Sequence, residues 1–182
     1  MYQLLRLPCD VAQSKRLLTI DSLVFSYWKH ALSSLESGLQ RCSIPCVRID
    51  GDLSAHERAR ALSAFRTNPE VKVMLLTFGV GSVGLTLTEA THVHLVEPHW
   101  NPMVEEQAIA RAHRIGMDKP VTVWRYIVEN SIEGGIIRKQ RQKLYLAKIA
   151  QAKEEVGGRA GVHEKQNEDL EDLLEECHLI QG

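Results

Sequence analysis

Val71-Lys-Val-Met-Leu-Leu-Thr77 decides the fold class of this chain, because five of its seven residues are apolar. Such near-continuous apolar content is typical of a parallel β-strand that is covered on both faces. A sheet with two covered faces needs helices on either side of it. The stretch therefore predicts an α/β protein.

Short apolar runs and helical patterns alternate on both sides of this strand. The further strands that we expect are at 23–26, 45–50, 92–97 and 121–127. Because strands that alternate with helices are joined by right-handed crossovers, the order predicts an open, mostly parallel sheet. The fold class expected is a three-layer α/β sandwich.

Helix starts are marked by capping residues. Ser54-Ala-His-Glu57 has the capping-box pattern, a hydroxyl at the cap and a carboxylate three residues later, and its helix should stop before Pro69. Asn101-Pro102 places a cap and a first-turn proline ahead of a helix for which Gly116 is a natural end. A last long helix is expected from Ile132 to about Ala152.

The two ends of the chain fit the alternating pattern poorly. Residues 1–20 show no clear period and are interpreted as a leader or truncated remnant. Gly157-Gly158 makes a flexible joint before an acidic amphipathic segment. The domain organisation expected is a lobe at 21–152 and an acidic, partly helical tail at 153–182, which we interpret as solvated rather than as a binding element.

Composition and charge narrow the class of protein. The 182 residues are 44% apolar and 25% charged, as in an ordinary globular domain, and no apolar run approaches the roughly 20 residues that span a bilayer. Residues 1–150 carry 19 Lys and Arg against 14 Asp and Glu, whereas residues 151–182 carry three against nine. This distribution permits an anionic partner. The four cysteines lack metal-ligand spacing, so we expect reduced thiols and no metal site.

The segment Gln107–Gly116 carries the clearest chemical signal. With 3.6 residues per turn, Gln107, Arg111 and Arg114 fall on one helix face. Two guanidinium groups with permanent charge suit a phosphoryl group whose charge grows in a transition state. The alternative is a solvated basic face, the usual place for Arg side chains.

A glycine-rich turn at 79–84 follows the strand at 71–77. Gly81 and Gly84 allow close backbone approach, which a loop needs where it closes on a phosphate, a sugar or another domain. Taken alone, this spacing also fits a simple turn.

Four blocks in a fixed order resemble the C-terminal lobe of Swi/Snf-type ATPases, which are superfamily-two, helicase-like DNA translocases. The blocks are Leu23-Val-Phe-Ser-Tyr-Trp28, Arg48-Ile-Asp-Gly51, Leu75–Thr88 and Gln107–Gly116. The likeness covers about residues 21–150 and is greatest to the fungal members related to helicase-like transcription factor and the Rad repair translocases. It implies a RecA-like lobe, ATP as the nucleotide, the backbone of duplex DNA and a first RecA-like lobe as partners, nucleosomes as a further partner, and a nuclear location.

The resemblance assigns roles on the nucleotide side of the lobe. Arg111 and Arg114 match the two arginines that reach the ATP phosphates, and Gln107 matches the amide that opens the motif. Gly81, Gly84 and Thr86 match nucleotide-binding positions, although Thr86 stands where the family has Asn or Asp. Met117 replaces the Gln that follows Gly116 in the family.

On the DNA side, Thr77 resembles the hydroxyl that contacts a backbone phosphate. Ser26 and Gly51, within the Asp50-Gly51-Asp52 turn, occupy further backbone-contacting positions. Trp100 and Asn101 match an aromatic residue and its cap, and Trp100 fits a core position as well as a DNA or inter-lobe contact. Phosphate contacts position a protein without reading sequence, so binding should be salt-sensitive and indifferent to base identity.

The residues of a complete ATPase site are not all present in this sequence. It has no Gly-x-x-x-x-Gly-Lys-Ser/Thr loop and no acidic pair to hold Mg²⁺, which the resemblance assigns to the first lobe. We therefore expect half of a motor with no ATPase activity of its own. One alternative is a free-standing lobe that binds DNA or a partner. A nucleotide-binding oxidoreductase or transferase would need Gly-x-Gly-x-x-Gly after 23–26, where Tyr27-Trp28-Lys29-His30 stands instead.

Overall fold

The computed structural model describes residues 2–5, 21–81, 85–113 and 119–155. The chain divides into two units, 1–136 and 137–182, and the sheet lies in the first. The elements are β1 (Tyr2–Leu5), β2 (Ser22–Ser26), α2 (Lys29–Arg41), β3 (Cys46–Ile49), α3 (Ala55–Thr67), β4 (Val73–Thr77), α4 (Phe78–Gly81), β5 (His92–Leu95), α5 (Pro102–Ala112), β6 (Thr122–Tyr126) and α6 (Ile132–Glu155). The predicted tail at 153–182 lies almost wholly outside the described residues, and the predicted domain bounds stay a prediction.

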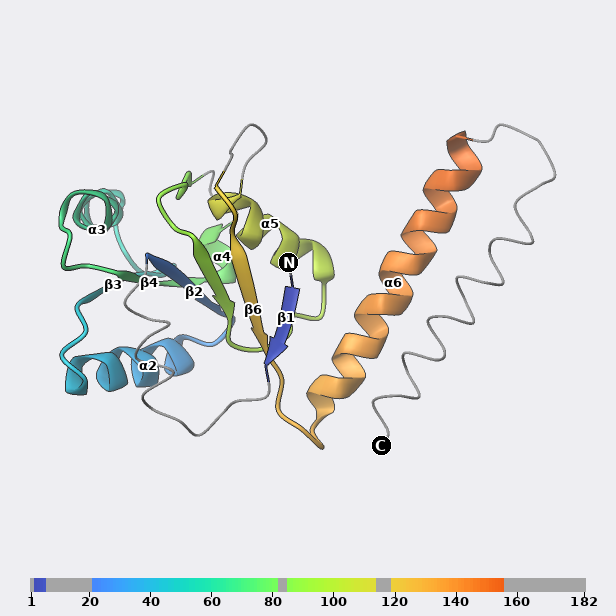
Figure 1. Ribbon diagram of the computed structural model, residues 1–182, viewed down its shortest axis with the longest axis horizontal. Coiled ribbons are helices and arrows are strands. Elements are labelled where there is room, and N and C mark those ends of the chain that lie inside the picture. The colour runs from blue at the N-terminus through green and yellow to red at the C-terminus, as the bar shows by residue number, and fades with distance from the viewer. Residues whose placement is uncertain (1, 6–20, 82–84, 114–118, 156–182) are drawn as a thin grey trace. The chain divides into compact units, whose positions relative to one another are not determined.

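Six strands form one sheet in the order β1-β6-β5-β2-β4-β3, and each neighbouring pair is parallel. β2 lies inside the sheet, with Val24 opposite Leu75 of β4 on one side and opposite His94 of β5 on the other. The chain visits β3 and β4 on one side of β2 before it crosses to β5 and β6 (Figure 1). The predicted parallel sheet is confirmed.

β1 is a strand that the sequence pattern did not predict. Residues 1–20 were interpreted as a leader or remnant, yet Tyr2–Leu5 pairs with β6, with Tyr2 opposite Val123. Four residues are too few for a period to show in the sequence. The pairing is decided by the free edge of β6, which offers unpaired backbone groups to any extended segment that reaches it.

Helices cover both faces of the sheet, as a three-layer sandwich requires. The step from β2 to β3 runs one way along the sheet, whereas the steps from β3 to β4 and from β5 to β6 run the other way. Right-handed crossovers then place α2 on one face and α3 and α5 on the opposite face. Figure 1 shows α2 and α3 on opposite sides of β2, β3 and β4, and α5 shares its core cluster with α3 rather than with α2.

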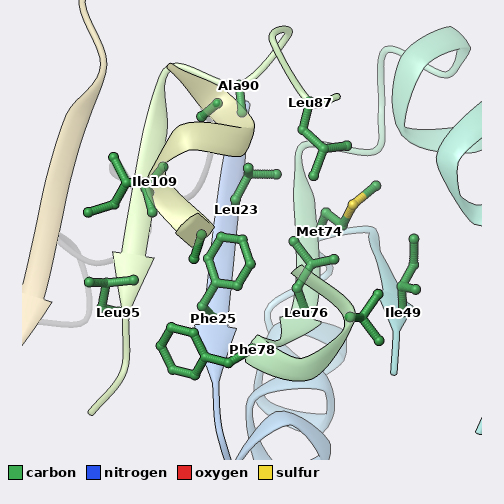
Figure 2. Close-up of a cluster of buried hydrophobic side chains, with 14 of the residues drawn as sticks. Leu23, Phe25, Ile49, Met74, Leu76, Phe78, Leu87, Ala90, Leu95 and Ile109 are labelled. Carbon is green, nitrogen blue, oxygen red and sulfur yellow. The ribbon is translucent and has the colours of Figure 1, made fainter. Parts of the chain in front are cut away.

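The core follows the alternation of side chains along the strands. Leu23 and Phe25 point to the face covered by α3, α4 and α5, and Val24 between them packs with Leu32 and Leu39 of α2. The larger cluster brings side chains of five strands together with those of α3, α4 and α5. Figure 2 shows part of it, with Phe25 and Leu76 of the sheet beside Phe78 of α4. The cluster aligns the carboxyl ends of β2, β3 and β4 at one edge.

The predicted caps are confirmed, and one helix end differs. Ser54 and Glu57 make both bonds of the capping box at the start of α3. The Asn101 side chain accepts a hydrogen bond from the N–H of Met103 at the start of α5. α5 ends at Ala112 rather than at Gly116, because His113 already has extended backbone angles (φ −104°, ψ 110°).

Candidate functional site

A cleft of about 420 Å³ opens at the carboxyl ends of β2, β3 and β4. Its walls come from the strand ends and from the segments that follow them: Tyr27, Lys29, Gly51, Arg58, Thr77, Gly79 and Val80. The chain continues from β2 to one side of the sheet and returns later to the other side, so the cleft lies beside a topological switch point. Open α/β sheets bind ligands in such crevices.

Thr77 and Ser26 are register partners at the ends of β4 and β2, but they have different surroundings. Thr77 lines the cleft. Ser26 is fully buried, and its hydroxyl donates to Glu97 Oε1 at 2.9 Å while accepting the N–H of Trp28 at 3.0 Å. Ser26 is not among the residues that line the cleft, and its hydroxyl holds the loop that follows β2. The DNA-backbone contact expected of Ser26 stays a prediction.

Glu97 anchors that loop from the end of β5. Its Oε1 accepts hydrogen bonds from the Ser26 hydroxyl and from the N–H of Tyr27. Burial raises the pKa of the Glu97 carboxyl above its usual value, although the hydrogen bonds from Tyr27 and Ser26 work in the opposite direction. The carboxylate thus ties the ends of β2 and β5 together.

The Asp50-Gly51-Asp52 turn forms another wall of the cleft. Asp50 accepts the N–H of Asp52 at 3.0 Å and pairs with Arg48 Nη2 at 2.8 Å. Partial burial would raise the pKa of the Asp50 carboxyl, but the hydrogen bond from Asp52 and the Arg48 guanidinium outweigh it and lower the pKa. A Cβ at Gly51 would meet no atom within 4 Å, so the backbone there is open to a ligand.

Two cations on this edge were not among the predicted site residues. Lys29 Nζ lies 2.6 Å from Asp52 Oδ1, and both side chains are exposed. Arg58 Nη2 lies 3.4 Å from the carbonyl oxygen of Gly51, and its buried Nε has no hydrogen-bond partner among the described residues. Both residues stand in the first turn of a helix that follows a parallel strand, and such helices begin at the carboxyl edge. A basic residue in the first turn of a helix that follows a predicted strand is the sequence signal that could have identified Lys29 and Arg58.

The predicted nucleotide side gathers near the C-terminal end of α5. The Arg111 carbonyl accepts the N–H of Leu87 at 3.0 Å, so α5 and the segment after the glycine-rich turn meet here. Arg111 is partly buried, and its Nε has no hydrogen-bond partner among the described residues. The neighbouring Thr86 carbonyl accepts Arg66 Nη2 at 2.6 Å. Gln107 is exposed one turn earlier on α5.

The structure describes only some of the other residues predicted for the nucleotide site. Gly81 is the last residue of α4, so the predicted turn at 79–84 starts as a helical turn. Gly84 and Arg114 lie outside the described residues. The structure therefore brings Arg111 and Thr86 together.

Trp100 and Asn101 stand at the opposite end of α5. Trp100 is 56% exposed, which excludes the core position that the sequence left open. With a rise of 1.5 Å per residue, Asn101 and Arg111 are roughly 15 Å apart along the helix. Glu105, in the first turn of α5, is buried and pairs with Arg125 Nη2 at 2.6 Å. It also accepts a hydrogen bond from the N–H of His99 at 2.7 Å, which holds the loop before α5 in place.

Within the described residues, no group of three His, Cys, Asp or Glu side chains is arranged to hold a metal ion. No described helix combines the length and the apolar character needed to cross a bilayer.

Known proteins match both the sequence and the fold. Residues 10–116 match the family model of the helicase conserved C-terminal domain. The chain is 42% identical over 124 residues to helicase-like transcription factor CHR28 of Arabidopsis thaliana and 37% identical over 156 residues to DNA repair protein rad5 of Neurospora crassa. These alignments cover 68% and 86% of this chain, but only 13% and 12% of those proteins.

A solved structure agrees with the sequence comparisons. The crystal structure of the C-terminal part of the Fun30 ATPase domain superposes with a TM-score of 0.66 at 29% identity, covering 71% of this chain and 44% of that one. The predicted RecA-like fold class is thereby confirmed. The chain belongs to the helicase conserved C-terminal domain family, with relatives among the Swi/Snf-type helicase-like proteins of DNA repair and transcription.

Proposed function

We propose that the chain is the second RecA-like lobe of an ATP-dependent DNA translocase of the Swi/Snf type, acting in the nucleus in DNA repair or chromatin remodelling. The observation that carries the proposal is the cleft at the carboxyl edge, where Thr77, Gly51 and two cations face one opening. The relatives named for DNA repair and the helicase family support this assignment.

The cleft suits a DNA backbone rather than base edges. Its polar side-chain groups are the hydroxyls of Tyr27 and Thr77, the Lys29 ammonium and the Arg58 guanidinium, all of which can donate to phosphate oxygens. At Gly51 and Gly79 no side chain stands between the backbone and the cleft, and a Cβ at either position would meet no atom within 4 Å. Binding of this kind is salt-dependent and indifferent to sequence.

The C-terminal end of α5 suits the phosphates of ATP. Arg111 is partly buried, and its guanidinium is a permanently charged group of planar donors, which suits the anionic oxygens of a phosphate. When bound, ATP supplies a γ-phosphoryl group whose charge grows during transfer. Arg111, together with Arg114, would stabilise that charge, and Gln107, Gly81, Gly84 and Thr86 would orient the nucleotide. Mg²⁺ would be held by the first lobe.

The partners follow from this division of roles. A first RecA-like lobe, in cis or in trans, supplies the phosphate loop and the acidic pair that are absent from these 182 residues. Duplex DNA occupies the cleft, and nucleosomes are the packaged form of that substrate. The chain by itself has no ATPase activity.

Two measurements on the purified chain and one on a joined motor test this function. We expect salt-dependent binding of a labelled duplex by fluorescence anisotropy, with similar affinity for unrelated sequences. We expect no ATP hydrolysis by the chain alone, and DNA-stimulated hydrolysis once it is joined to the first lobe of a Swi/Snf-type relative. DNA-stimulated turnover by the chain alone, abolished in Arg111→Ala, would contradict the proposal.

A free-standing lobe that binds DNA or a partner without hydrolysis is the second candidate. It is favoured by a cleft with Thr77 and two cations in a sequence of 182 residues that has no phosphate loop and no acidic pair. The joined motor separates the two candidates. Duplex binding that persists while the joined motor stays inactive with several first lobes would assign the binding function only.

A further inference from the structure

Tyr27 and Trp28 form an exposed aromatic ledge beside the cleft. Their side chains are 57% and 60% exposed, and the two rings meet edge to face with centroids 5.0 Å apart. The ring of His99 lies 5.6 Å from Tyr27 and 5.4 Å from Phe78, which stacks on Phe25 in the core. The ledge is therefore the outer end of a row of rings that starts in the hydrophobic core.

The backbone under the ledge is held in place. The N–H of Tyr27 donates to the Glu97 carboxylate, and the N–H of Trp28 donates to the Ser26 hydroxyl. Two successive peptide groups are thus fixed by buried or half-buried side chains. The rings are presented without the entropy cost of ordering a loose loop.

Trp28 has no evident structural task at its position. It is the N-cap residue of α2, where Ser, Thr, Asp or Asn is favoured, and its side chain makes no capping hydrogen bond. It also remains largely outside the core.

Charge beside the ledge identifies its occupant. Tyr27 lines the same cleft as Lys29 and Arg58. Lys29 is paired with the exposed Asp52, whereas the Nε of Arg58 has no partner among the described residues. Cationic groups that track a backbone, next to aromatic rings that accept any base, are the combination by which proteins bind single-stranded nucleic acid.

We propose that Tyr27 and Trp28 are a stacking site for an unpaired base, and that the chain prefers DNA containing single-stranded nucleotides over a continuous duplex. This inference rests on the proposed function, because the phosphates of the same strand must lie in the cleft. A strand seated there passes the ring of Tyr27, which belongs both to the cleft wall and to the ledge.

Anisotropy titrations with two probes test the inference. The probes are a labelled oligothymidine, which has no secondary structure, and a labelled blunt duplex of the same length. We expect Trp28→Ala and Tyr27→Leu to weaken oligothymidine binding by about tenfold, and duplex binding much less. Trp28→Phe should retain most of the affinity. Val128→Ala, which truncates another exposed apolar side chain, should change neither.

A second readout follows the ring itself. The chain has three tryptophans, so a variant with Trp100→Phe and Trp124→Phe leaves Trp28 as the sole tryptophan. Oligothymidine should quench its fluorescence, and the blunt duplex should not. This measurement needs no loss of affinity, and it stays informative if Trp28→Ala unfolds the chain.

The possible results distinguish failure of the stacking site from failure of the proposed DNA-translocase function. Wild-type binding of the duplex, without quenching by oligothymidine or with equal losses on both probes, overturns the stacking site and leaves the proposed function intact. Binding of neither probe overturns both. Unchanged DNA affinity in Trp28→Ala, with loss of association with a first lobe, overturns the inference and assigns the ledge to the lobe interface.

Discussion

The cleft at the carboxyl edge and the C-terminal end of α5 differ in how completely this chain builds them. The cleft is enclosed by strand ends in register and by ion pairs such as Arg48–Asp50. The end of α5 presents an exposed Gln107 and a partly buried Arg111, and the sequence has neither the phosphate loop nor the acidic pair that a nucleotide site also needs. The contrast supports a lobe that grips DNA by itself and contributes to ATP hydrolysis only beside another domain.

Arg111→Ala should abolish the contribution of α5 to ATP hydrolysis without changing DNA binding in the cleft. In a motor joined to a first lobe, we expect DNA-stimulated ATP hydrolysis to fall by about 10³-fold or more, because an arginine finger contributes on the order of 10³–10⁵ in rate. Arg111→Lys should recover little, since an ammonium lacks the planar fork. Duplex affinity by anisotropy should stay unchanged, and a parallel loss of affinity would contradict the separation of the two regions.

Glu105→Leu should loosen the start of α5 and the loop before it, because Glu105 binds both Arg125 of β6 and the N–H of His99. It leaves the partly buried Arg125 without the carboxylate of Glu105, which costs about 2–3 kcal/mol in the free energy of unfolding, below the full cost of an isolated buried charge because Arg125 keeps some contact with solvent. Adding Arg125→Met should restore most of the stability, as measured by urea unfolding. Asp52→Asn, which breaks the exposed pair with Lys29, should cost less than about 1 kcal/mol. Equal losses in the free energy of unfolding for Glu105→Leu and Asp52→Asn would contradict the structural role of Glu105.

Arg58→Ala should weaken the cleft alone. We expect a severalfold loss of duplex affinity, and the slope of log K against log salt should fall by about 0.9 for the one phosphate contact removed. ATP hydrolysis by the joined motor at saturating DNA should be unaffected. Arg60→Ala is the matched control, because Arg60 stands two residues further on α3, about 200° around the helix. Equal effects of the two variants would reduce Arg58 to a general surface charge.

Acid should weaken the wall of the cleft at Asp50. The pKa of Asp50 is lowered in the folded chain, so its ionised form contributes stability above its unfolded pKa near 3.8. This contribution is lost as the pH falls from about 4 through the lower folded value. Asp50→Asn should cost about 1 kcal/mol at pH 7, and the difference from wild type should shrink below pH 4 in urea unfolding. A difference independent of pH would show that the charge of Asp50 is not involved.

Local patterns predicted most of the elements correctly. Apolar runs identified five of the six strands, and the capping box at Ser54 and the cap at Asn101 are both present. These features depend on neighbours within one turn or one strand, so a sequence displays them directly. β1 was missed because it exists only through the edge of β6.

The candidate site was predicted less completely, since it depends on which side chains face the cleft. Ser26 and Thr77 end adjacent strands, yet the Ser26 hydroxyl donates a hydrogen bond to Glu97, a residue 71 positions away in the sequence. Lys29 and Arg58 enter the site from two different helices, and no linear motif marks them.

The sequence by itself determined the α/β class, the order of strands and helices, the family resemblance and the candidate arginines, because all of these are written in local spacing. Only the tertiary structure decided which residues line the cleft, that Ser26 is buried and that Tyr27 and Trp28 are exposed beside two cations. The physical reason is that a parallel sheet brings together the ends of strands that are far apart in the chain. Contacts across those ends depend on register and crossover, which no short stretch of sequence contains.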